Sequence, residues 1–137
     1  MLEKATAPLN QAFTPPKLSV LCIDDSPGML TICRTILEAN GYSVLTALGA
    51  EAALEILENN VVNAAVIDDG LNEIDASSLA RKIHKTSPRL PVVVFMRSSS
   101  PVGVVSETEI YVSKASGPKA LLAAIVRACK IEPELQS

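Results

Sequence analysis

Hydrophobic and polar residues follow one another along the chain in blocks that predict strands and helices in turn. Five short apolar runs, rich in Val, Ile, Leu and Ala, are typical of strands buried on both faces of a sheet. Between them, apolar residues recur at the three- and four-residue spacing of one helix face. The predicted strands are Leu18–Ile23, Tyr42–Thr46, Ala64–Ile67, Pro91–Met96 and Ile110–Val112. The predicted helices lie between Ser26 and Asn40, over Ala50–Glu58, over Ser77–Lys85 and over Pro118–Ile131.

This alternation predicts an α/β fold, because strands joined through helices form right-handed units around a parallel sheet. We expect a doubly wound, flavodoxin-like sheet of five parallel strands in the order 2-1-3-4-5, with helices on both faces. Residues 1–16 end in two prolines and predict a flexible leader. The domain then covers residues 17–131, and residues 132–137 form a C-terminal tail.

Composition narrows the possible functions of this domain. The chain has 137 residues, 48% of them hydrophobic, and a net charge of −3 with scattered basic residues, so a nucleic-acid interface is not expected. The apolar runs are too short to span a membrane, and the chain opens with no secretory signal. Three cysteines without paired metal-ligand spacing, and a single histidine, His84, argue against zinc. Buried free thiols fit a reducing cytoplasm, which we therefore predict as the location.

Acidic residues follow two of the predicted strands. Asp24 and Asp25 come after the first strand and Asp68 after the third, whereas Asp69 should point away because side chains alternate. If these strands are neighbours, the acids converge at the edge of the sheet and repel one another. Mg²⁺ would relieve that repulsion, since it prefers oxygen ligands and binds phosphate oxygens. Lys114 follows the fifth strand on the same edge, which completes the charges of a phosphoryl-transfer site.

These motifs resemble the receiver domain of two-component response regulators. The resemblance covers about residues 17–131 and rests on the acids, the lysine and their spacing. The matching segments are Val20–Pro27, Gly41–Val44, Ala47–Ala52, Val66–Asp68, Ile74-Asp75 and Tyr111–Lys114.

The resemblance implies a role for each of these site residues. Asp68 would accept the phosphoryl group with help from Lys114. Mg²⁺ would be bound by Asp25, Asp68 and the Gly70 carbonyl, and by Asp24 through water. A histidine kinase or phosphotransfer protein would donate the phosphoryl group, and an output protein that the sequence does not identify would receive the signal by contact.

Several positions depart from the family pattern. Met96 replaces the Thr or Ser whose hydroxyl contacts the phosphoryl group, and Arg97 replaces the small residue that follows. We therefore regard Met96 and Tyr111 as the switch positions, although Tyr111 fits a core residue equally well. We interpret Arg97 as a solvated residue at the rim rather than a phosphate ligand. The segment from Met96 to Lys114 is short, which predicts a fourth helix that is short or missing. Gly70 is expected to leave water an open path to the acyl phosphate.

Two functional hypotheses follow from these observations. The leading one is a single-domain phospho-receiver that catalyses only its own phosphorylation and dephosphorylation and is otherwise not an enzyme. The alternative is a pseudo-receiver, a protein-interaction module that phosphate does not switch, and the sequence leaves its oligomeric state open. A flavodoxin or a phosphatase on a related sheet fits poorly, because Gly70 occupies the place of a second catalytic aspartate.

Overall fold

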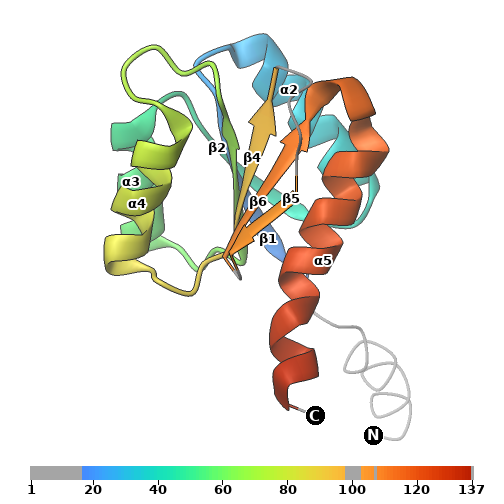
Figure 1. Cartoon of the computed structure of the whole chain (residues 1–137). Coiled ribbons are helices and arrows are strands. Elements are labelled where there is room, and N and C mark those ends of the chain that lie inside the picture. Colours follow the sequence, from blue (N-terminus) through green and yellow to red (C-terminus); the bar gives the residue numbers. More distant parts are fainter. Residues whose placement is uncertain (1–16, 98–102, 107, 137) are drawn as a thin grey trace, which may run out of the picture.

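The fold is a twisted sheet with helices on both faces (Figure 1). The computed structural model describes residues 17–97, 103–106 and 108–136. The predicted leader, residues 1–16, lies outside the described residues. No helix among the described residues has the length and apolar content needed to cross a membrane.

The sheet has six strands in the order β2-β1-β3-β4-β6-β5. The strands β1, β2, β3, β4 and β6 all pair in parallel, which confirms the predicted order of the five parallel strands. The strands are β1 (Ser19–Ile23), β2 (Ser43–Ala47), β3 (Ala64–Asp68), β4 (Val92–Met96), β5 (Gly103–Ser106) and β6 (Glu109–Ser113). The helices are α2 (Pro27–Ala39), α3 (Ala50–Asn59), α4 (Ala76–Thr86) and α5 (Pro118–Gln136), with a 3-10 turn, η1, at Lys114–Ser116.

Beyond the five predicted parallel strands, β5 adds a sixth strand that the sequence did not predict. The sequence predicted that the fourth helix would be short or missing, and the described residues between β4 and β6 contain β5 and no helix. β5 pairs antiparallel with β6, with an irregularity between Val104 and Ser106. Two adjacent valines, Val104 and Val105, favour an extended backbone. The pairing also satisfies backbone groups of β6 that would otherwise lie at the edge of the sheet.

Two apolar layers hold the helices to the sheet. On one face, α2 and α5 pack over Val20, Val66 and Val93. On the other face, α3 and α4 cover Ile67 and Val94. Figure 1 shows the same division, with α3 and α4 on the opposite side of the sheet from α5. The alternation of side chains along each strand produces this two-sided core.

Local capping fixes where the helices begin. The Ser26 hydroxyl accepts a hydrogen bond from the Met29 N–H at 3.3 Å, and Pro27 follows it at the first helical position. The Asp75 carboxylate caps α4 by accepting from the Ser78 N–H at 3.0 Å. α5 continues through Gln136, so the helix extends beyond the predicted end at Ile131.

Candidate functional site

The carboxyl ends of β1, β3 and β6 bring three charged side chains to one edge of the sheet. Ile23 pairs with Ile67, so the next residues, Asp24 and Asp68, stand beside each other where the two strands end. Lys114 follows β6, and its ammonium group forms an ion pair with Asp68 Oδ1. Asp68 is 4% exposed and the Lys114 side chain 22% exposed. The pair is therefore largely screened from water, which strengthens its electrostatic interaction.

Both oxygens of the Asp68 carboxylate have a donor. Lys114 binds Oδ1, and the Gly70 N–H donates to Oδ2 at 2.8 Å. The Lys114 ammonium also lies 5.5 Å from the centroid of the Phe95 ring, a cation–π distance. Ser113 caps the turn that holds the lysine, since its hydroxyl accepts from the Ala115 N–H at 3.1 Å. These contacts fix the position of the cation against the carboxylate.

Asp24 is the second buried acid at this edge. It is 6% exposed, and its Oδ1 accepts a hydrogen bond from the Ser26 N–H at 3.0 Å. Burial raises the pKa of Asp24 above its ordinary value, and the Asp68 charge raises it further. The Ser26 hydrogen bond and the Lys114 charge lower the same pKa, but burial is the largest effect. Negative charge is thus concentrated here at a cost that a bound cation would reduce.

Asp25 is engaged with a different loop. Its Oδ2 accepts a hydrogen bond from the Asn72 backbone N–H at 3.2 Å. Together with Leu48, Asn72 and Glu73 it lines an open hollow of about 360 Å³. Asn72 stands four residues after Asp68, where the receiver family that the sequence resembles usually has proline, and only a residue other than proline has the N–H that makes this bond.

The three acids do not form an assembled metal cluster. Among the described residues, no group of three or more His, Cys, Asp or Glu side chains is close enough to hold a metal ion. The donor chemistry still fits Mg²⁺, since Asp24, Asp25 and Asp68 supply carboxylate oxygens at the ends of adjacent strands. Asp25 would have to exchange the Asn72 N–H for the ion.

Asp69 joins the ends of β3 and β4, a role that sequence reasoning missed. Both of its carboxylate oxygens lie 3.2 Å from the Arg97 backbone nitrogen, which donates to them. Asp69 therefore serves the loop after β4 rather than the Asp68–Lys114 pair, in keeping with its predicted direction away from that pair. No sequence signal other than its position after Asp68 pointed to this contact.

Gly70 lies directly beneath the side chain of Arg97. A Cβ atom placed on Gly70 would come within 2.5 Å of Arg97 Cζ and 2.7 Å of Nε, which is closer than real contacts allow. The space beside Gly70 is thus filled by a guanidinium group. Arg97 therefore occupies part of the space beside Gly70 through which the sequence predicts that water reaches the acyl phosphate.

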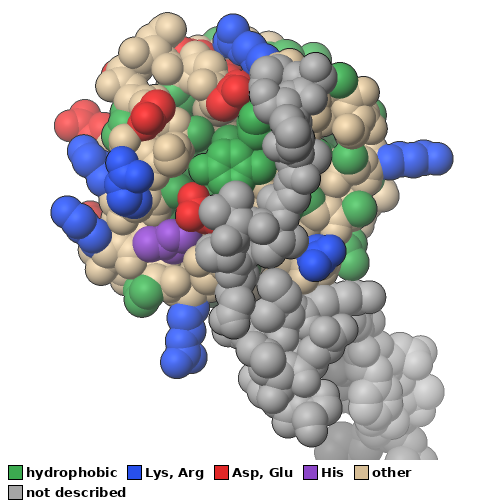
Figure 2. All heavy atoms as spheres, in the orientation of Figure 1, with side chains coloured by type: hydrophobic (Ala, Val, Ile, Leu, Met, Phe, Trp, Pro, Cys, Tyr) green, Lys and Arg blue, Asp and Glu red, His purple; other side chains and the backbone are tan. Residues whose placement is uncertain are grey.

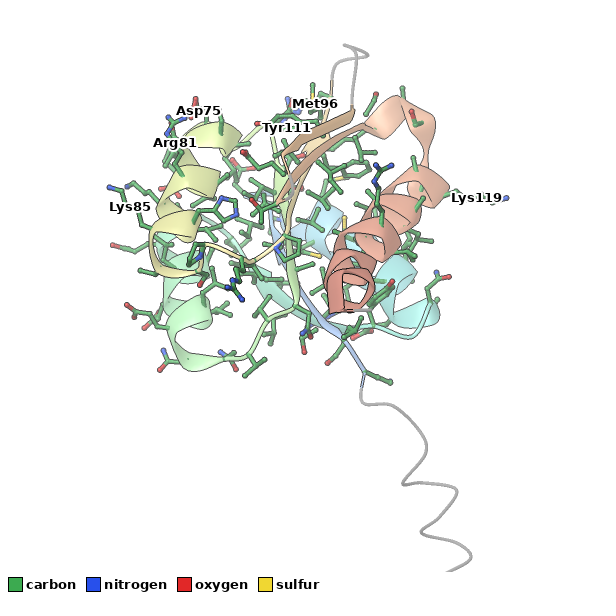
Figure 3. All side chains as sticks on the ribbon, turned by 60° about the horizontal axis from the view of Figure 1, so that its bottom comes forward. Asp75, Arg81, Lys85, Met96, Tyr111 and Lys119 are labelled. Carbon is green, nitrogen blue, oxygen red and sulfur yellow. The ribbon has the colours of Figure 1, made fainter. Side chains whose placement is uncertain are left out.

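The two predicted switch positions lie close together on neighbouring strands. Tyr111 pairs with Val94, so Met96 follows two residues later on the same face of the sheet. Both side chains are half-buried and pack against the apolar layer under α3 and α4 (Figure 3). Burial raises the pKa of the Tyr111 hydroxyl. Figure 2 shows apolar side chains open to view at the centre of the face between α4 and α5.

Comparison with known proteins agrees with this arrangement. The sequence model of the response regulator receiver domain matches residues 20–126. The transcriptional regulatory protein GlrR of Escherichia coli (strain K12) is 31% identical over 90 residues, which make up 66% of this chain and 20% of that protein. The gliding motility regulatory protein of Myxococcus xanthus is 30% identical over 102 residues, or 73% of this chain and 13% of that protein.

A solved structure shows the same fold. The response regulator receiver domain protein (CheY-like) from Methanospirillum hungatei JF-1 superposes with a TM-score of 0.74 at 26% identity, covering 89% of this chain and 100% of that one. The chain therefore belongs to the response-regulator receiver family of two-component signalling. It spans a fifth of GlrR and less of the Myxococcus protein, so the remaining parts of those proteins have no counterpart in this match.

Proposed function

We propose that this domain accepts a phosphoryl group on Asp68 and signals by contact with another protein. The observation that carries the proposal is the buried ion pair between Asp68 and Lys114 beside the second buried acid, Asp24. Removing two charges from water costs free energy that their mutual attraction only partly recovers. Buried charge pairs of this kind are found often at functional sites.

The geometry supports a simple transfer step. An Asp68 oxygen forms a bond to the phosphorus of a donor phosphohistidine. The phosphorus–nitrogen bond breaks, its electron pair stays on the imidazole nitrogen, and that nitrogen takes up a proton. Lys114, which binds Asp68 Oδ1 before transfer, can then bind an oxygen of the new phosphoryl group. Asp68 is the nucleophile, and the surrounding residues supply position and charge.

Mg²⁺ is the cofactor that this donor set fits best. Asp24, Asp25, Asp68 and the Gly70 carbonyl are the groups that would hold it. When bound, the ion would neutralise charge on the phosphoryl oxygens. Burial raises the pKa of Asp24, and the nearby Asp68 charge adds to the rise, so a bound cation would relieve part of the cost of the charged carboxylate.

Receiver domains interact with histidine kinases or phosphotransfer proteins, and we propose one of these as the donor. Apart from its own phosphorylation and dephosphorylation, we do not expect the domain to catalyse a reaction. The output would pass to a partner protein through the face that carries Met96 and Tyr111. Kinase-driven transfer of this kind fits a cytoplasmic location.

A pseudo-receiver remains the second candidate because two observations favour it. Met96 packs its apolar side chain into the core and offers the phosphoryl group no hydroxyl. Asp25 also accepts a hydrogen bond from the Asn72 N–H, and no three acids among the described residues are arranged to hold a metal ion. In this reading the domain binds its partner constitutively, and the Asp68–Lys114 pair serves only stability.

The two functions differ in whether Asp68 gains mass. The purified domain is incubated with Mg²⁺ and a small-molecule phosphodonor such as acetyl phosphate, then analysed by intact-protein mass spectrometry. The receiver function predicts one added phosphoryl group in the wild type and none in Asp68→Asn. An unmodified wild type that also fails to bind Mg²⁺ would overturn the receiver function and favour the pseudo-receiver.

A further inference from the structure

Arg97 is held beside the proposed phosphorylation site by its backbone. Its N–H donates to both oxygens of the Asp69 carboxylate at 3.2 Å, and Asp69 follows Asp68 directly. This contact ties the first residue after β4 to the end of β3. The Arg97 backbone is therefore held against Asp69, the residue that follows the acceptor Asp68 in the chain.

The guanidinium group then lies against Gly70. The space that a Cβ would occupy at Gly70 is taken by Arg97, whose Cζ is 2.5 Å and whose Nε is 2.7 Å from that position. The same Gly70 donates its N–H to Asp68 Oδ2 at 2.8 Å. One residue thus contacts the Asp68 carboxylate through its backbone and the Arg97 guanidinium through its open side.

The Arg97 side chain is exposed, and its guanidinium forms no ion pair with any other residue that the structure describes. By contrast, Arg34 on α2 pairs with Glu38 at 3.6 Å. An arginine fork without a carboxylate partner, placed beside an acidic site, is suited to bidentate binding of phosphate oxygens.

The phosphorylated site would need such a cation. With a phosphoryl group on Asp68, the charges of Asp24, Asp25 and the phosphoryl oxygens together exceed those of Mg²⁺ and Lys114. Met96 supplies no donor, since its thioether is a weak acceptor only. A further positive group at this edge would balance the charge and replace the missing hydroxyl bond.

We propose that Arg97 is a direct ligand of the phosphoryl group on Asp68, and that the lack of a side chain at Gly70 lets the guanidinium reach that phosphoryl group. The inference rests on the proposed receiver function. Arg97 and Lys114 would bind phosphoryl oxygens from two sides. Hydrolysis of the acyl phosphate forms a bond from the water oxygen to phosphorus and breaks the bond from phosphorus to the Asp68 oxygen. The Asp68 oxygen keeps the electron pair of that bond, and the proton of the water leaves with phosphate.

The test uses beryllium fluoride, which adds to an aspartate in the presence of Mg²⁺ and imitates the phosphoryl group without turnover. Binding is followed by ¹⁹F NMR for wild type, Arg97→Ala, Arg97→Lys and the control Arg81→Ala, which removes an exposed arginine of α4. We expect Arg97→Ala to weaken binding about tenfold, because a hydrogen bond to a charged group is lost. Arg97→Lys should retain part of the affinity, and Arg81→Ala should match the wild type.

Each result decides between distinct readings. Equal affinity in wild type and Arg97→Ala would overturn the inference while leaving the receiver function intact. Tighter binding in Arg97→Ala would also overturn it and show that the guanidinium obstructs the site. A wild type that binds no more beryllium fluoride than Asp68→Asn would remove the receiver function, and the inference with it.

Gly70→Ala supplies an independent check. Its Cβ must displace the guanidinium, which is the far end of a flexible side chain, so folding should survive and can be verified by thermal unfolding. We expect Gly70→Ala to weaken beryllium fluoride binding. In a Gly70→Ala, Arg97→Ala double variant, the affinity should be close to that of Arg97→Ala alone, because both changes remove the same contact. Effects that multiply in the double variant would contradict a shared contact.

Discussion

Replacing Asn72 with proline should tighten Mg²⁺ binding. The backbone N–H of Asn72 donates to Asp25 Oδ2 at 3.2 Å, and proline has no N–H to donate. Asp25 would then be free to turn toward Asp24 and Asp68, where the receiver resemblance assigns it to the ion. The change also restores the residue that the family usually has at this position.

The size of the effect follows from the bond that is lost. A net contribution of about 1 kcal/mol for one hydrogen bond corresponds to about a fivefold change in an equilibrium constant. Since the bond is exposed, water replaces part of it, and a larger effect is not expected. We therefore predict that Asn72→Pro lowers the Mg²⁺ dissociation constant about fivefold.

Isothermal titration with MgCl₂ measures this directly, and Asn72→Ala is the matched control. Alanine removes the same side chain but keeps the N–H, so its affinity should equal that of the wild type. Thermal unfolding of each variant would show that the loop change leaves the fold intact. The reasoning is refuted if Asn72→Pro binds Mg²⁺ no more tightly, or if Asn72→Ala tightens binding equally.

Three further predictions concern stability. Asp24→Asn should stabilise the domain at pH 7, because the raised pKa means that the folded state disfavours the charged carboxylate. This gain in stability should vanish below the ordinary pKa of 3.8, where the carboxylate is protonated in both states. Urea unfolding at both pH values tests this, and a gain that persists at low pH would be the contrary result. Lys114→Met should lower the free energy of unfolding in urea by about 3 kcal/mol, since it leaves the buried Asp68 carboxylate without a cation. The loss should be smaller in a Lys114→Met, Asp68→Asn double variant, and an equal loss in both variants would show that the ion pair is not the cause. Leu79→Ala should cost about 3 kcal/mol because the side chain is fully buried, whereas Val61→Ala, at 83% exposed, should change stability little; similar costs at both sites would contradict the assigned core.

The parallel sheet was predictable because its strands are continuous apolar runs. Val92–Val94 and Ala64–Ile67 contain no polar residue, which indicates burial on both faces. β5 was missed because Gly103–Ser106 is short and includes glycine and serine, and its formation depends on β6 as a partner. A sequence pattern reports only the local preference for an extended backbone, whereas this strand also requires a tertiary contact.

The features of the candidate site also fall into two groups, those that the sequence could place and those that it could not. Asp24, Asp68 and Lys114 could be placed from the sequence because each follows a strand, and the ends of parallel strands meet at one edge. The Asn72 N–H bond to Asp25, and the Arg97 side chain over Gly70, could not be placed, since both depend on the path of a loop. Met96 and Arg97 were visible as departures from the family, but only the structure shows that one packs inward while the other reaches over Gly70.

Locating the phosphoryl group on the chain tests the central claim most directly. After treatment with acetyl phosphate and Mg²⁺, the acyl phosphate is reduced with borohydride, which converts the modified aspartate to homoserine, and peptides are sequenced by tandem mass spectrometry. The account predicts conversion at Asp68 and at none of Asp24, Asp25 or Asp69. Conversion at one of those other acids, or none anywhere in the chain, would contradict it.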